Sequence, residues 1–444
     1  SRWADCIIGD YNYAFDPRVY LRRFFDEEGG AYAFLVDEAH NLVDRSREMF
    51  SAHLSKSAFL ELRRAIRPDL PDLYRTAGKI NTWMRQSASQ TTVEGGFAAE
   101  PRLPDGLAPL LREFVRLAER WLAKNQPAAF RETLLDRYFA VTGFLRVWEA
   151  FDDSYVTCRR VTGNDLLINL FCLDPSPQLK AALQRARSVL FFSATMTPAG
   201  YFQEILGCEP TVTKLAITSP FPRDHFKVVI AGGVSTYYTQ RERSLNQVTA
   251  LIRACVDVKP GNYLCFFPSF AYMAMAVDLL RAASWGVRML VQEREMDSAQ
   301  RARFLDHFED PRCDGLVGFA VMGGIFGEGI DLVGERLCGA VIVGVGLPAI
   351  CAERDLIRDY FDARGTGFDF AYRFPGFNRV LQAAGRVIRT EDDRGVLMLI
   401  DQRFNSSGYQ GLLPPHWQPA VIRSTGQLET QLRHFWKGDR RPAR

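Results

Sequence analysis

The alternation of short apolar runs with helical stretches in the second half of the chain limits the possible folds most. Apolar runs of strand length lie at 227–231, 263–267, 287–291, 316–321 and 339–345. Helical spacing of apolar residues separates the first four runs, at 245–256, 272–283 and 299–308. Strands and helices that alternate in this way form a doubly wound parallel sheet, so an α/β fold is predicted. A further strand is expected at 396–400 and a closing helix at 426–436.

A second feature is the run Phe34-Leu35-Val36, which leads directly into Asp37, Glu38 and His40. A run without alternation suits a strand buried on both faces, and ligands of open α/β sheets gather beyond the carboxyl ends of the strands. Asp37 could hold Mg²⁺, which prefers oxygen ligands, while Glu38 deprotonates a water that attacks a γ-phosphate. Alternatively, both acids cap a following helix, because Asp and Glu favour first turns.

A third feature is the segment QAAGRVIR, which runs from Gln382 to Arg389 and contains Gly385 and Arg386. Two arginines three positions apart lie on one face of a helix. Guanidinium groups bind phosphate oxygens in a fork and stabilise charge on a transferring phosphoryl group. The alternative is a solvated basic helix end. The presence of both this segment and the acidic one favours a phosphate site.

Taken together, these segments resemble those of superfamily 2 helicases of the Rad3/XPD and DinG type. The resemblance covers nearly the whole chain and includes CLDPS at 172–176, FSATMTP at 192–198, FFPSF at 266–270, GEGID at 327–331, GLP at 346–348 and DQRF at 401–404. Each match is short, but their order and spacing are those of the family.

The resemblance implies an ATP-dependent DNA helicase with RecA-like P-loop motor domains. ATP and Mg²⁺ would bind between two motor domains, with Asp37 on the metal and Glu38 as the base. His40 would couple this site to the 382–389 segment, from which Arg386 and Arg389 would reach the phosphates. The expected partner is single-stranded or forked DNA in repair or replication, with movement in the 5′ to 3′ direction.

The resemblance also implies nucleotide and DNA contacts for residues of the other motifs. The resemblance implies nucleotide contacts for Glu328, Gly329, Asp331 and Gly385. It also implies DNA contacts for three hydroxyl side chains, those of Ser193, Thr195 and Ser269. Glycines let the backbone approach a ligand closely, although taken singly they are more often turns. For Ser193 and Thr195 the alternative is an ordinary turn after a strand.

Four parts of the chain are predicted. Residues 1–50 form the end of motor domain 1 with the DEAH sequence, and 161–222 return to that domain. Between them, 51–160 show helical stripes without strand periodicity and resemble the family's helical arch, with a mobile loop at 86–104. Residues 223–444 form motor domain 2. The first motor domain is expected to be incomplete.

A phosphate-binding loop, GxxxxGK[ST], does not occur in these residues. The only Gly-Lys pair, Gly78-Lys79, is followed by isoleucine. We therefore expect a fragment that is inactive by itself, with any iron–sulfur cluster in a preceding segment. Two other functions stay open, namely a non-catalytic nucleic-acid clamp and the helicase part of a helicase–nuclease fusion.

The composition of the chain bears on metal binding, DNA binding and cellular location. Nine cysteines without a CxxC pair argue against a zinc site and fit a reducing cytosol. A net charge of +3 means that any DNA surface must arise from local clustering of basic residues. No segment has the length and apolarity of a membrane span or a secretion signal. The arginine-rich composition is typical of a GC-rich bacterial genome, so we expect a bacterial cytoplasmic protein associated with the nucleoid.

Overall fold

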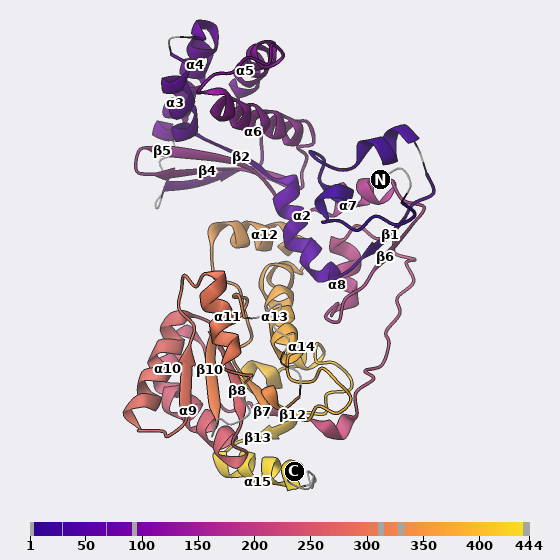
Figure 1. The fold of residues 1–444 in the computed structure, drawn as a ribbon, viewed down its shortest axis with the longest axis vertical. Helices are drawn as coiled ribbons and strands as arrows, with labels where there is room; N and C mark the ends of the chain where they lie inside the picture. The colour runs from indigo at the N-terminus through magenta and orange to yellow at the C-terminus, as the bar shows by residue number, and fades with distance from the viewer. Residues whose placement is uncertain are drawn as a thin grey trace. The chain divides into compact units, whose positions relative to one another are not determined.

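The computed structural model describes residues 4–28, 30–67, 69–90, 96–309, 315–326, 332 and 334–437. The chain divides into two compact units, Ser1–Val212 and Thr213–Arg444, each of which is described by itself (Figure 1). Within the described residues, no helix is long and apolar enough to cross a membrane.

The second unit is built on a seven-stranded sheet in which every pair of neighbouring strands is parallel. The strand order is β13-β7-β12-β11-β8-β10-β9. The strands are β7 (Phe226–Ala231), β8 (Asn262–Phe267), β9 (Arg288–Val291), β10 (Leu316–Val321), β11 (Gly339–Val343), β12 (Gly395–Ile400) and β13 (Ala420–Ile422). The predicted doubly wound parallel sheet is therefore confirmed, and β13 is a strand that the sequence did not predict.

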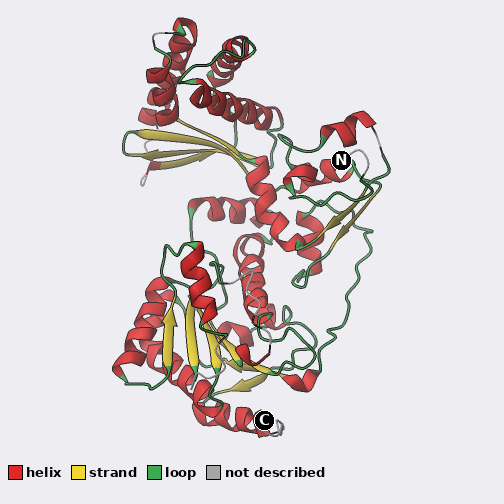
Figure 2. Ribbon diagram, viewed as in Figure 1, coloured by secondary structure: helices red, strands yellow, loops and turns green. Residues whose placement is uncertain are grey.

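Helices cover both faces of this sheet (Figure 2). The helices are α9 (Arg241–Val258), α10 (Phe270–Ala282), α11 (Ser298–Asp306), α12 (Ala352–Asp362), α13 (Phe374–Ala384), α14 (Ser407–Gln410) and α15 (Thr425–Lys437). Side chains of β8 alternate between two cores, because Cys265 packs with α9, α10 and α15, whereas Phe266 packs with α11 and α13. Burial on both faces explains why β8 reads as an unbroken apolar run.

The first unit contains a two-stranded parallel sheet of β1 (Ala33–Val36) and β6 (Ser188–Phe191). The helices nearest to it in sequence are α1 (Asn12–Phe15), α2 (Leu42–Phe50), α7 (Ser176–Leu183) and α8 (Ala199–Ile205). The short apolar run at residues 6–9 pairs with no described strand, and its Ile8 is 96% exposed.

The first unit also contains a four-stranded antiparallel sheet, in the order β2-β5-β4-β3. Its strands are β2 (Ala52–Ser55), β3 (Phe97–Glu100), β4 (Tyr155–Thr162) and β5 (Asp165–Cys172). The expectation that 51–160 contain no strands is therefore wrong, and the sheet continues across the expected boundary at residue 160. β3 also lies within the expected loop at 86–104, where pairing with β4 satisfies its backbone groups.

Four helices accompany this antiparallel sheet (Figure 2). They are α3 (Lys56–Ala65), α4 (Pro71–Gln90), α5 (Leu107–Leu122) and α6 (Arg131–Glu149). Of these, α3, α4 and α6 contact its strands, and α5 packs on α4 and α6. The apolar stripe predicted for α5 is buried at Leu107, Leu111 and Phe114, so it belongs to the core as expected. Gly78-Lys79 lies in the middle of α4, where the backbone amides are used by the helix and cannot cradle a phosphate.

Candidate functional site

The parallel pairing of β1 and β6 brings two polar segments together at one edge of the sheet. Val36 is in register with Phe191, and the next residue, Phe192, donates its N–H to the Val36 carbonyl at 3.0 Å. The N–H of Ala39 in turn donates to the Phe192 carbonyl at 3.1 Å. The residues that follow both strands therefore share the carboxyl edge, as the sequence predicted for ligand-binding side chains.

Glu38, His40 and Ser193 form a hydrogen-bonded cluster at this edge. The Ser193 hydroxyl donates to Glu38 Oε2 at 3.1 Å, and His40 Nδ1 lies 2.7 Å from Ser193 Oγ and 3.3 Å from Glu38 Oε2. Because a hydroxyl has one proton, donation to Glu38 requires that His40 Nδ1 carries a hydrogen and donates to Ser193. The Glu38 side chain is nevertheless 59% exposed, whereas that of His40 is 8% exposed. A carboxylate that is oriented by protein hydrogen bonds and is open to solvent can accept a proton from water.

Thr195 supports the serine of this cluster. Its backbone N–H donates to Ser193 Oγ at 3.2 Å, and its own hydroxyl lies 3.4 Å from the same oxygen. Thr195 is 7% exposed, so its side chain is available to a bound strand only through Ser193 or a local movement. The structure thus joins Ser193 directly to Glu38, and Thr195 to Glu38 through Ser193. Their expected contact with DNA stays a prediction.

The backbone of Glu38 adopts a left-handed conformation, with φ 45° and ψ 42°. Such a conformation costs a residue other than glycine about 1–3 kcal/mol, so neighbouring contacts must hold it. The Tyr11 hydroxyl lies within hydrogen-bond distance of the carbonyl oxygens of Asp37, at 2.6 Å, and Glu38, at 2.9 Å. Burial, followed by the negative charges of Glu38 and Asp37, raises the pKa of Tyr11 to about 12. Tyr11 therefore stays protonated and can donate at neutral pH.

Asp37 provides the carboxylate that was expected to hold Mg²⁺. Its side chain is exposed, and Oδ1 accepts the N–H of Glu38 at 2.7 Å. Among the described residues, no group of three or more His, Cys, Asp or Glu side chains could hold a metal ion. A Mg²⁺ ion here would take one or two carboxylates and fill its other positions with water and phosphate oxygens, which is its usual mode in nucleotide sites. The residues fit Mg²⁺ in this mode.

In the second unit, the expectation that Arg386 and Arg389 share one helical face is wrong. Gln382 lies in the last turn of α13, which ends at Ala384 with Gly385 as the C-cap residue. Arg389 therefore lies beyond the helix. Beyond the helix, a buried carboxylate binds the backbone at Arg389 in a conformation that is not helical.

That carboxylate belongs to Asp393, which is 4% exposed. Its Oδ2 accepts the backbone N–H groups of Arg389 at 2.7 Å and Thr390 at 2.8 Å, and its Oδ1 accepts the N–H of Gly334 at 3.0 Å. Three charge-assisted hydrogen bonds fix the backbone that carries Arg389. Sequence reasoning missed both Asp393 and Tyr11, because a side chain that binds backbone groups leaves no spacing pattern.

Ser269 follows β8 at the carboxyl edge of the seven-stranded sheet. Its hydroxyl caps α10 by accepting the Tyr272 N–H at 3.3 Å, and it also accepts from Arg241 Nη1 at 3.3 Å. The hydroxyl proton is still available to donate to a ligand. Three of the residues expected to contact the nucleotide, Glu328, Gly329 and Asp331, lie outside the described residues.

Comparison with known proteins finds helicases that resemble this chain. The sequence model of the helicase C-terminal domain matches residues 252–420. The XPD helicase subunit of general transcription and DNA repair factor IIH from Arabidopsis thaliana is 26% identical, over 93% of this chain and 65% of that protein. The ATP-dependent DNA helicase CHL1 from Meyerozyma guilliermondii is 22% identical, over 88% of this chain and 54% of that protein.

The fold agrees with these sequence relationships. The solved structure of Xpd4 from S. tokodaii matches with a TM-score of 0.61 at 14% identity, over 93% of this chain and 81% of that one. These matches support a superfamily 2 helicase of the Rad3/XPD type. The chain has the α/β fold with parallel sheets that the resemblance implied. It spans between 34% and 65% of the length of the first curated relatives that it matches.

Proposed function

We propose that this chain is part of an ATP-dependent motor that moves along single-stranded DNA and unwinds duplexes. Its similarity to Rad3/XPD-type helicases supports a DNA helicase in general. The 5′ to 3′ direction, the forked substrate, a role in repair or replication and a place in a bacterial cytoplasm are the finer parts of the proposal. DNA is the partner, and ATP with Mg²⁺ supplies the energy.

The observation that carries the proposal is the Glu38–His40–Ser193 cluster. A general base must be oriented and accessible to water. Glu38 meets both conditions, because His40 and Ser193 hold one of its carboxylate oxygens while the side chain is 59% exposed. Asp37, the preceding residue, would hold Mg²⁺, which supplies charge neutralisation for the phosphates when it is bound.

The arginines of the second unit complete the proposed chemistry. We assign Arg386 and Arg389 to stabilising charge on the transferred phosphoryl group, as guanidinium groups do in phosphoryl-transfer enzymes. The three hydrogen bonds from Asp393 support this assignment for Arg389, because a catalytic cation must be held in place before the reaction. The coupling of His40 to the 382–389 segment is part of the same proposal.

The test uses the complete protein, including any residues beyond these 444. ATP hydrolysis is measured with and without single-stranded DNA, and unwinding is measured on forks with either a 5′ or a 3′ single-stranded tail. Glu38→Gln keeps the size and hydrogen bonding of the side chain but removes the base. We expect ATP to bind while turnover falls by roughly 10²- to 10⁴-fold.

Glu48→Gln is the matched control, because Glu48 is an exposed acid of α2 that pairs only with Arg45 in the described part of the chain. Normal turnover of Glu38→Gln would mean that Glu38 is a structural acid. A complete protein that binds DNA without turning over ATP would instead be a nucleic-acid clamp. The 444 residues by themselves are expected to be inactive, since they contain no GxxxxGK[ST] sequence.

A further inference from the structure

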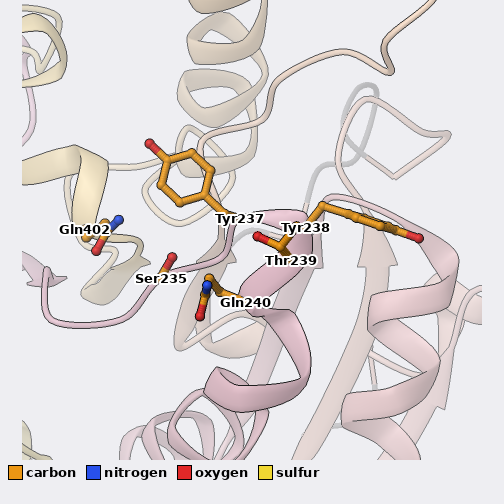
Figure 3. Close-up of a pocket in the computed structure, with 6 residues that line it drawn as sticks. All are labelled: Ser235, Tyr237, Tyr238, Thr239, Gln240 and Gln402. Atoms are coloured by element: carbon orange, nitrogen blue, oxygen red, sulfur yellow. The ribbon is translucent and has the colours of Figure 1, made fainter.

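The second unit has an open hollow of about 570 Å³. Six residues line it, namely Ser235, Tyr237, Tyr238, Thr239, Gln240 and Gln402 (Figure 3). Figure 3 shows the rings of Tyr237 and Tyr238 pointing to opposite sides of the segment that carries them. Nothing in the helicase chemistry described above uses these side chains.

Tyr238 is the most exposed aromatic residue of this group, at 82% against 46% for Tyr237. A single exposed aromatic residue is ordinary on a protein surface. Tyr238 differs from that case because the Arg241 guanidinium carbon lies 5.4 Å from its ring centroid. A cation on one part of the ring helps to orient it, and the exposed area leaves room for a flat partner.

Arg241 is a positive charge that has no ion-pair partner in the described part of the chain. Its guanidinium lies between two rings, 5.1 Å from the centroid of Tyr272 as well as next to Tyr238, and it donates to Ser269 Oγ at 3.3 Å. Among the described residues, no carboxylate forms an ion pair with it, and burial lowers its pKa from the ordinary value. It begins α9, a helix of 18 residues, so the helix dipole adds positive potential at the same point.

Arg403, which lies next to Tyr237, differs from Arg241 because it is paired with an acid. It lies 4.5 Å from the Tyr237 ring centroid, and its charge is used by Asp401, which accepts from Arg403 Nε at 2.8 Å and Nη2 at 2.7 Å. Asp401 is 0% exposed. The Tyr237 side is therefore neutralised from within the protein, whereas the Tyr238 side attracts an anion.

We propose that Tyr238 stacks on a base of a single DNA strand while Arg241 and Ser269 bind an adjacent phosphate. This inference rests on the proposed function and adds a contact to it. Base stacking on aromatic rings beside a backbone-binding cation is how proteins hold single strands without reading sequence. A free nucleotide is a poorer match, because small-molecule sites bury most of their ligand. The hollow is open, and Tyr238 keeps most of its surface in solvent.

The experiment measures the affinity of the complete protein for a fluorescent oligothymidylate by anisotropy, across a range of salt concentrations. Tyr238→Ala should weaken binding about 5- to 150-fold, the range for losing one stacked base. The salt slope should not change, since no charge is lost. Tyr238→Phe keeps the ring and should restore affinity. Arg241→Ala should instead lower the salt slope by about 0.7, the value for one phosphate contact on a single strand.

Two controls separate stacking from other causes. Phe139→Ala removes an aromatic side chain that is 61% exposed in the first unit and should leave affinity unchanged. On a strand with abasic positions, the wild-type protein and Tyr238→Ala should bind equally, because there is no base to stack.

Three results would overturn the inference. If the wild-type protein and Tyr238→Ala bind the oligothymidylate with equal affinity, there is no stacking subsite at Tyr238, and the proposed function is unaffected. Lost affinity for a fluorescent ADP analogue, with DNA affinity intact, would mean that Tyr238 binds adenine. A wild-type protein that binds no single strand would remove both the subsite and the proposed function.

Discussion

Removing the Asp393 carboxylate tests whether it holds the backbone that carries Arg389. In Asp393→Ala, the N–H groups of Arg389, Thr390 and Gly334 lose the acceptor that they share. An unsatisfied buried donor costs about 1–3 kcal/mol. Water can reach part of this segment, since Arg389 and Thr390 are only half-buried. We therefore expect the free energy of unfolding of the second unit to fall by about 3–5 kcal/mol.

Asp393→Asn should cost less. If the amide oxygen faces Arg389 and Thr390, both of these hydrogen bonds survive in a weaker, uncharged form. The amide nitrogen then faces the N–H of Gly334, so one donor is left opposite another donor. A loss of about 1–3 kcal/mol follows for this variant.

The assay is urea and thermal unfolding of the 444-residue chain, with Glu391→Ala as the control. Glu391 is exposed, and the contact it makes with His225 uses its backbone carbonyl, which the substitution keeps. For a domain of this size, 1 kcal/mol shifts the Tm by about 2–4 °C, so Asp393→Ala should lower the transition of the second unit by about 6–20 °C. If Asp393→Ala unfolds within about 0.5 kcal/mol of Glu391→Ala, the carboxylate does not hold this backbone.

Two further predictions concern Arg389 and Tyr11. In the complete protein, Arg389→Ala should reduce kcat by roughly 10³- to 10⁵-fold, and Arg389→Lys should rescue little because a point charge cannot reproduce the planar fork. Normal hydrolysis with a reduced salt slope of DNA binding would make Arg389 a DNA contact. The raised pKa of Tyr11 favours its protonated form in the folded state, so its contribution to stability is present below about pH 10 and is lost towards about pH 12. In urea unfolding, Tyr11→Phe should be less stable than the wild type at pH 8, and a stability difference that stayed constant up to pH 12 would contradict this.

The second unit could be predicted well from sequence because its central strands β8, β10, β11 and β12 are buried on both faces. In β8 the residues from Leu264 to Phe267 are all apolar and buried, so they do not suggest a surface strand. β13 was missed because three residues are too few to show a period. β2 and β3 are four residues each and lie among long helical stripes. Their pairing with distant strands, rather than their own sequence, makes them strands.

The candidate site was predictable to the extent that parallel strands align their ends. Ser193 and Glu38 each come just after a strand. They lie close together because these two strands are parallel neighbours. The left-handed backbone of Glu38 and the carboxylate of Asp393 could not. Both depend on where particular N–H and C=O groups point, which local sequence does not encode.

The antiparallel sheet of the first unit has a topological consequence. β2 and β5, the strands by which the chain leaves and rejoins the neighbourhood of Glu38, pair directly from Ala52 with Leu170 to Ser55 with Leu167. The Ser51 hydroxyl closes this junction by accepting the Cys172 N–H at 2.9 Å. The chain between β2 and β5 can therefore grow, shrink or be exchanged without moving the ends that hold it. A different insertion could therefore be exchanged at this junction while Ser51, β2 and β5 keep their contacts.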